Sequence, residues 1–158
     1  MLFRSTNAQT AVDRINNAAA ITSYGGSFYL NNANANQGVV YSETVGAIAA
    51  SAGQFDVYLQ TNQSGGQDTG LNGPLNSQTL TIGGLSRSGT GVVAFSSPPD
   101  TTYNDTGLNA TTNIIRNSAI ASATPTGELI GAWATVGTNT TQQRDYAAYD
   151  SSGRIVAA

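Results

Sequence analysis

Histidine, cysteine and lysine are all absent from this 158-residue chain. Without histidine or cysteine, the sequence excludes zinc sites of the usual kinds, a thiolate nucleophile and an imidazole general base. Without lysine it excludes Schiff-base catalysis. The lack of cysteine also excludes disulfides, so oxidising surroundings are neither required nor ruled out. Because these absences remove most catalytic mechanisms, we expect a protein that is not an enzyme and has no cofactor.

Charge is scarce as well, since 6 basic and 9 acidic residues make up only 9% of the chain, against about 25% in an average domain. The arginines are dispersed and the net charge is −3, so no basic face is available for the phosphates of a nucleic acid, which we exclude as a partner. No apolar stretch approaches the roughly 20 residues of a membrane span. The first seven residues lack the apolar segment of a signal peptide. We therefore expect synthesis in the cytoplasm and no membrane partner.

Small and uncharged polar residues take the place of the missing charges. Ser, Thr, Asn and Gln supply 59 residues, and Gly with Ala another 40. Leu, Ile, Val and Phe total only 31, close to the roughly 20% below which chains fail to build a core. The low net charge and the 12 aromatic residues argue against disorder. We expect one domain with a thin core, which gains stability from burial against copies of itself or a larger assembly.

The N-terminal residues 1–23 are the stretch most compatible with a helix. Apolar residues that include Val12 and Ile15 follow Asn7, a good N-cap residue, at helical spacing. Two asparagines in the middle of the stretch disfavour a helix. An arm that becomes ordered only on contact with a partner fits equally well, so residues 1–23 are predicted to be a short helix or an extended arm.

The rest of the chain, residues 24–158, is predicted to be a single β domain. Apolar and polar residues alternate with a period of two between turn clusters, most clearly where Phe55, Val57 and Leu59 share one face. Other runs of this kind are 27–30, 39–45, 79–82, 92–96, 113–120, 129–136 and 144–149. The run 113–120 also fits a single helical turn. Seven or eight short strands between such turns predict a mainly β fold, an antiparallel β-sandwich or jelly-roll-like barrel.

One internal similarity stands out, because the segment 68–72, Asp-Thr-Gly-Leu-Asn, recurs at 105–109, 37 positions later. It is interpreted as a turn that its own Asp and Thr cap, used twice, or as a duplicated strand pair. Paired Asp-Thr-Gly segments also resemble the aspartic-protease signature, in which Asp68 and Asp105 would share a proton. The flanking residues depart from that signature, and 37 residues are too few for two barrel lobes, so turn capping is favoured.

A calcium site is a further alternative for the loop acids. Asp100 and Asp105 could offer the oxygen ligands that calcium prefers. Two carboxylates five positions apart form no known loop motif, so no metal ligand is predicted and the question stays open.

Aromatic and apolar residues are the candidates for contacts with partners. A lone tryptophan in an apolar strand, Trp133, is predicted to lie in the core or in a subunit interface, with a sugar-stacking platform as the alternative. Tyrosines combine an apolar body with a polar tip, which suits a contact surface. The candidate contact residues are Phe3, Val12, Ile15, Trp133, Tyr146 and Tyr149.

In size, composition and strand pattern, the whole chain resembles the small virion structural proteins of tailed bacteriophages, above all the head decoration or cement proteins. The resemblance implies a non-enzymatic virion subunit that stabilises a capsid lattice as a homotrimer or other symmetric oligomer. Its partners would be its own copies and the major capsid protein or other virion proteins. The alternatives are a phage tail or fibre component, an extracellular filament subunit assembled by strand exchange, and a carbohydrate-binding β-sandwich.

Overall fold

The computed structural model describes residues 2–4, 14–32, 40–61, 77–97, 113–120, 127–138 and 141–158. These residues form fourteen strands, and no helix occurs among them. The strands are β1 (Leu2–Arg4), β2 (Ile21–Ser23), β3 (Gly26–Asn32), β4 (Val40–Val45), β5 (Ile48–Ala50), β6 (Gln54–Thr61), β7 (Ser77–Ile82), β8 (Leu85–Arg87), β9 (Val92–Ser96), β10 (Asn113–Asn117), β11 (Glu128–Leu129), β12 (Ala134–Gly137), β13 (Gln143–Tyr149) and β14 (Ile155–Ala157).

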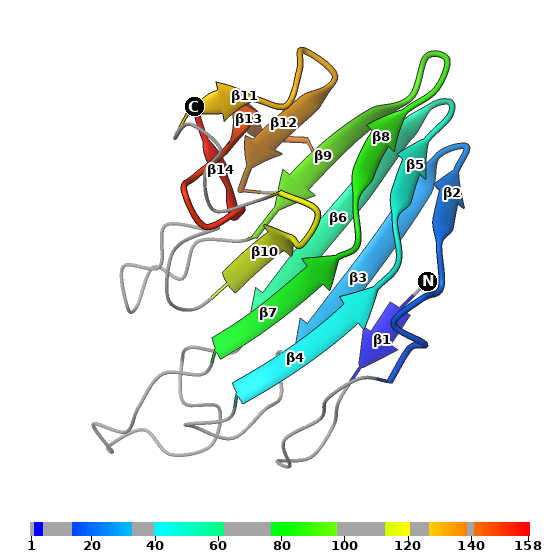
Figure 1. The fold of residues 1–158 in the computed structure, drawn as a ribbon, viewed down its shortest axis with the longest axis vertical. Coiled ribbons are helices and arrows are strands. Elements are labelled where there is room, and N and C mark those ends of the chain that lie inside the picture. The colour runs from blue at the N-terminus through cyan, green and yellow to red at the C-terminus, as the bar shows by residue number, and fades with distance from the viewer. Residues whose placement is uncertain are drawn as a thin grey trace.

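Successive strands visit three sheets in turn, as Figure 1 shows. The 8-stranded sheet A begins with the row β1, β3, β6, β9 and β12 and is extended by β13, β11 and β14. Sheet B is the row β4, β7 and β10, and sheet C is the row β2, β5 and β8. Within each of these rows every strand pairs in parallel with its neighbour. A chain that returns once per turn to the same sheet and pairs there in parallel is a parallel β-helix, in which each coil stacks on the one before.

The coil length explains the internal similarity in the sequence. Ile48 pairs with Leu85 and Val40 with Ser77, each 37 positions apart. The two Asp-Thr-Gly-Leu-Asn segments lie outside the described residues, between β6 and β7 and between β9 and β10, which are equivalent points of successive coils. The repeat is therefore one turn of the solenoid, as expected for stacked repeats.

Alternate side chains of each strand point into the coil and form continuous apolar rows. Phe28, Val57, Phe95 and Val136 occupy one such row across sheet A, and all are buried. Buried aliphatic residues of sheets B and C face this row and belong to the same core cluster. Because every coil repeats the same positions, the core is a column that extends through the stack.

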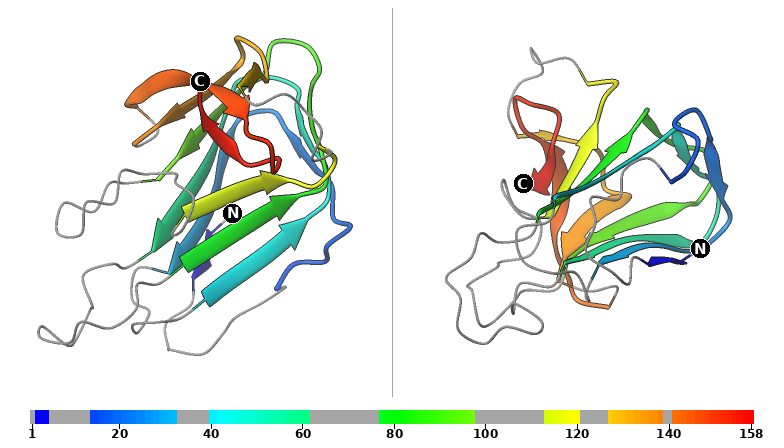
Figure 2. Two further views of the ribbon diagram at one scale, coloured as in Figure 1. Left: turned by 60° about the vertical axis from the view of Figure 1, so that its left-hand side comes forward. Right: turned by 90° about the horizontal axis from the view of Figure 1, so that it is seen from below.

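The mainly β prediction is confirmed, but the antiparallel pairing predicted for the sheets is wrong. An alternation of period two reports which side chains are buried and carries no information on strand direction. As in a sandwich, sheet B lies in front of sheet A with core between them. Among the described strands, antiparallel pairs occur where β13 meets β11, β12 and β14, at the C-terminal end of the stack (Figure 2), and an isolated antiparallel bridge joins Arg116 to Arg154.

The predicted N-terminal helix is not seen in the described residues of 1–23. β1 pairs with β3, and β2 belongs to sheet C, so two short strands of this segment obtain ladder hydrogen bonds from the stack. Residues 14–20 form turns and irregular backbone, and residues 5–13, with the predicted N-cap and Val12, lie outside the description. The alternation of 113–120 resolves into strand β10 followed by a turn.

A buried glutamate fastens the irregular segment 14–20 to the first complete coil. Glu43 of β4 is only 1% exposed. Its Oε2 accepts the backbone N–H of Arg14 at 3.0 Å, and its Oε1 accepts that of Ile15 at 2.9 Å. The Arg14 guanidinium lies 3.6 Å from the same carboxylate. A carboxylate so enclosed is stabilised by charge-assisted hydrogen bonds to the backbone.

The three corners of each coil differ in length. The connections from sheet A to sheet B take residues 33–39, 62–76 and 97–112, and they are longer than the connections at the other two corners. The other two corners take only a few residues and bring successive coils close together. A Cβ added at Gly91 would lie 2.5 Å from the carbonyl carbon of Ala50, so this tight corner requires glycine.

Candidate functional site

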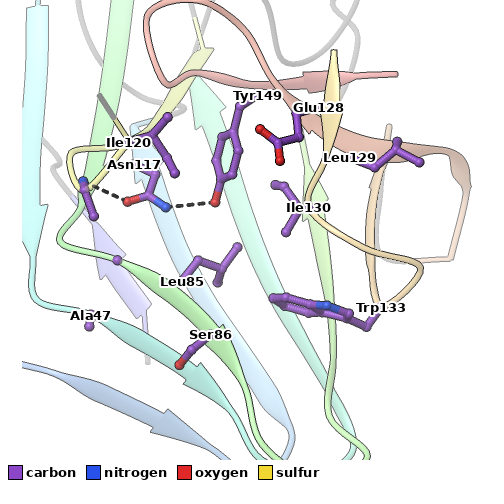
Figure 3. A pocket seen from close by; sticks show the side chains of 12 residues that line it. Ala47, Leu85, Ser86, Asn117, Ile120, Glu128, Leu129, Ile130, Trp133 and Tyr149 are labelled. Carbon is purple, nitrogen blue, oxygen red and sulfur yellow. Dashed lines mark hydrogen bonds between the residues drawn. The ribbon is translucent and has the colours of Figure 1, made fainter. Parts of the chain in front are cut away.

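Among the described residues, sheet C ends at β8, whereas sheet A continues beyond β9 with β12. After β10 the described chain makes a turn at residues 118–120 and next forms β11, which pairs with β13 instead of β8. The coil that contains β9 and β10 therefore has no described strand in sheet C. In the place of that strand lies a groove of about 520 Å³ (Figure 3).

Apolar side chains that are only partly buried line this groove. Leu85, Ile120, Ile130 and Trp133 all pack against the core cluster and all border the groove. They come from β8, from the turn after β10 and from the segment between β11 and β12. The groove is thus an opening into the side of the apolar column, at the point where one strand would close it.

A hydrogen-bonded pair forms the polar side of the groove. The Asn117 Nδ2 donates to the Tyr149 hydroxyl oxygen at 2.8 Å, and the Asn117 Oδ1 accepts the N–H of Ala119 at 3.0 Å. Burial raises the pKa of Tyr149, and the hydrogen bond from Asn117 acts in the opposite direction. The phenol therefore stays protonated at neutral pH and serves as a fixed polar wall.

The position of Trp133 depends on a glycine. Gly131 has a φ of 140°, which side chains rarely adopt, and a Cβ there would lie 2.5 Å from the indole Nε1. Backbone and indole are therefore in direct contact, and the ring borders the groove below Leu85 and Ile130 in Figure 3.

The outer edge of β8 faces the groove with backbone groups that pair with no strand of the described chain. Ile48 donates its N–H to the Gly84 carbonyl, and Ser88 donates to the Ala50 carbonyl, each at 2.9 Å. Since alternate residues of a parallel strand bond to a given neighbour, the N–H and C=O of Leu85 and Arg87 point away from β5. No backbone hydrogen bond joins these two residues to the described chain on that side.

No family model matches this chain, and no curated protein or solved structure does either.

Two of the six predicted contact residues, Trp133 and Tyr149, come together in the groove. Tyr146 is 50% exposed and lies elsewhere, beside a second hollow of about 330 Å³ that Thr135 and Arg144 also border. Tyr146 and Tyr149 belong to the same strand, β13, but they lie three residues apart. Their side chains therefore point to opposite faces of that strand, one exposed and one buried.

The three N-terminal candidate contact residues lie in different surroundings, and the structure describes only part of them. Ile15 packs against the core and donates its N–H to Glu43. Phe3 pairs through its backbone with Leu30 in sheet A, and its side chain lies outside the description, as does Val12.

Sequence reasoning did not single out Leu85, Asn117 or Ile130. The repeat itself gave no signal, because β10 pairs with β7 at an offset of 35 residues and the position equivalent to Leu85 is then Ile120, an aliphatic residue that packs on the core.

The described residues offer neither a metal cluster nor a membrane-spanning helix. Among them no group of three or more acidic residues is placed to hold a metal ion, and no helix has the length and apolarity to cross a membrane. Asp68, Asp100 and Asp105, considered for acid catalysis and calcium, lie outside the described residues.

Proposed function

We propose that this chain is a non-enzymatic structural subunit that acts by packing against neighbours in a virion or surface assembly. Of the placements expected from the sequence, the fibre or filament is favoured over head decoration. A parallel β-helix grows along one axis and keeps its cross-section, because each coil contacts only the coils before and after it. That shape suits a rod better than a cap on a lattice.

The observation that carries the proposal is the outer face of sheet B. Its outward side chains are almost free of charge and include a single basic residue, Arg116. The face consists of Val40, Ser42, Thr44, Ser77, Thr79, Thr81, Ile114 and Arg116. In Figures 1 and 2 no described strand lies across it. A flat face of short, uncharged side chains can be covered by a neighbour without stranding a charge.

The test is to place a charge in the middle of that face. Thr79 lies on the central strand β7, so Thr79→Arg would force a neighbour to bury an unpaired guanidinium. Thr22 is an exposed threonine of sheet C, and Thr22→Arg is the matched control. We expect the native chain to associate in size-exclusion chromatography with light scattering, Thr79→Arg to associate less, and Thr22→Arg to behave as the native chain.

Negative-stain electron microscopy of the same samples separates the two placements. Rods or filaments support a fibre component, and small closed rings support a decoration subunit. A native chain that stays monomeric at its highest soluble concentration, with circular dichroism unchanged in both variants, contradicts the assembly role.

A further inference from the structure

We propose that the groove beside β8 is an acceptor site for one extended strand of a partner chain, which pairs with the open edge of β8. The proposal rests on the assembly role proposed above and names how a partner attaches. An added strand would take the place in sheet C that the described chain leaves empty. Strand addition to an exposed sheet edge is a general mode of peptide recognition.

The backbone of β8 supplies the first reason. Leu85 and Arg87 direct N–H and C=O groups away from β5, and these groups have no backbone partner in the described chain. An open edge of this kind is a template for another strand. A small apolar ligand has no groups to pair with this alternating row of donors and acceptors, whereas an extended peptide carries them at the matching spacing.

The apolar wall supplies the second reason. Leu85 points into the coil, and Ile130 and Trp133 stand around it, each only partly buried although each packs on the core. In sheet C the equivalent inward position of the preceding coil is Ile48, which is fully buried because β8 and its neighbours cover it. A strand with one small or aliphatic inward side chain would give Leu85 the same cover.

The size and charge of the groove define the occupant. Each strand of sheet C is three residues long, so the acceptor takes a segment of about that length. Glu128 is the only charged side chain among the described lining residues. The partner segment is therefore short, extended and free of acidic residues, with small side chains at alternate positions.

A peptide that copies residues 46–51, Gly-Ala-Ile-Ala-Ala-Ser, is the natural probe, because it contains β5, the strand that already pairs with the other edge of β8. Trp133 is the single tryptophan of the chain and borders the groove, so its fluorescence reports occupancy. We expect a blue shift on titration, and slower amide exchange at Leu85 and Arg87 measured by NMR. The amide of Ser86, which faces β5, should change little.

Two modified peptides test whether the backbone edge is what binds. One carries N-methyl groups on alternate amides, and the other carries them on the remaining amides. Only one of the two removes the donors that face β8, so one should bind as the parent and the other should lose binding. Equal binding by both would overturn the proposal, since it would show that only side chains are recognised.

Protein variants give the second arm. Proline at an outward position of an edge strand removes a donor and leaves the inner ladder intact. Arg87→Pro should weaken the parent peptide by about tenfold or more, the equivalent of one lost hydrogen bond. Arg87→Ala removes the same side chain but keeps the N–H, and should bind within about twofold of the native chain. If Arg87→Pro fails to fold, the modified peptides still decide the question.

The outcomes separate this proposal from the assembly role. Association that depends on Thr79, with no peptide protection at Leu85 or Arg87, would refute the acceptor site and leave the assembly role standing. Peptide protection in a chain that is always monomeric would support the acceptor site and refute the assembly role. A shift of Trp133 fluorescence with cellohexaose, and none with the peptide, would identify a sugar site and overturn the proposal.

Discussion

Replacing Glu43 tests whether its carboxylate fastens the N-terminal segment to the coil. Its two oxygens accept the N–H groups of Arg14 and Ile15, and hydrogen bonds to a charged group contribute about 1.5–3 kcal/mol each. The Arg14 side chain is 26% exposed and lies 3.6 Å away, so the ion pair adds no more than about 1 kcal/mol. Glu43→Ala also removes the free-energy cost of burying a carboxylate, which offsets part of these contributions. We therefore expect Glu43→Ala to lower the free energy of unfolding by about 3–5 kcal/mol.

Two further variants divide that loss into its parts. Glu43→Gln keeps one acceptor oxygen but turns an NH₂ group toward the other backbone N–H, so we expect a loss of about 2–3 kcal/mol. Arg14→Ala should lose about 1 kcal/mol or less. Urea unfolding followed by circular dichroism measures all three, and amide exchange should accelerate at residues 14 and 15 in both Glu43 variants.

The order of the three losses decides the argument. If Arg14→Ala destabilises the fold as much as Glu43→Ala does, the ion pair is responsible and the backbone hydrogen bonds are not. If Glu43→Gln is as stable as the native chain, the two N–H groups do not depend on a charged acceptor, and the reasoning is refuted.

The remaining predictions concern the C-terminal end, the corners and the coil. Burial alone would raise the pKa of Asp150, but hydrogen bonds from Arg154 and Ser152 outweigh it and lower the pKa to about 2. The resulting stability is present above about pH 4 and is lost as the pH falls toward 2, so Asp150→Asn should cost about 1–2 kcal/mol at pH 7 in urea unfolding and progressively less in acid. Gly91→Ala would place a Cβ against a neighbouring backbone and should cost about 2 kcal/mol or more in thermal unfolding. The matched control is Gly84→Ala, whose Cβ would meet only a methyl group at 3.5 Å. It should change the free energy of unfolding by less than about 0.5 kcal/mol. Deletion of residues 47–83, one coil, should leave a folded protein with a urea m-value lower by roughly a quarter; loss of all β structure in the far-ultraviolet spectrum would show that the coils are not equivalent.

The long strands could be predicted from the sequence because their burial alternates over enough residues to be recognised. Residues 55–61, for example, coincide with most of β6. The strands of sheet C could not, since three residues such as 48–50 contain too few alternations to be distinguished from a loop. Strand direction was also out of reach, and only the recurrence at 37 positions pointed to stacking.

The candidate site was predictable only in part, for a related reason. Trp133 was expected in the core or at an interface because of its size, and it lies at an opening of the core. The opening itself results from a strand that sheet C does not receive, and no residue type marks such a gap.

The shared corner between sheets A and B bears on how this chain can change in length. Its three connections differ in size, 33–39 being much shorter than 62–76 and 97–112, yet the strands on either side still pair in parallel with their equivalents in the next coil. Residues can therefore be gained or lost at this corner without displacing a single ladder pair. This corner is where insertions and deletions should be tolerated best. A foreign peptide or an affinity tag could be inserted there while the stacked coils stay unchanged.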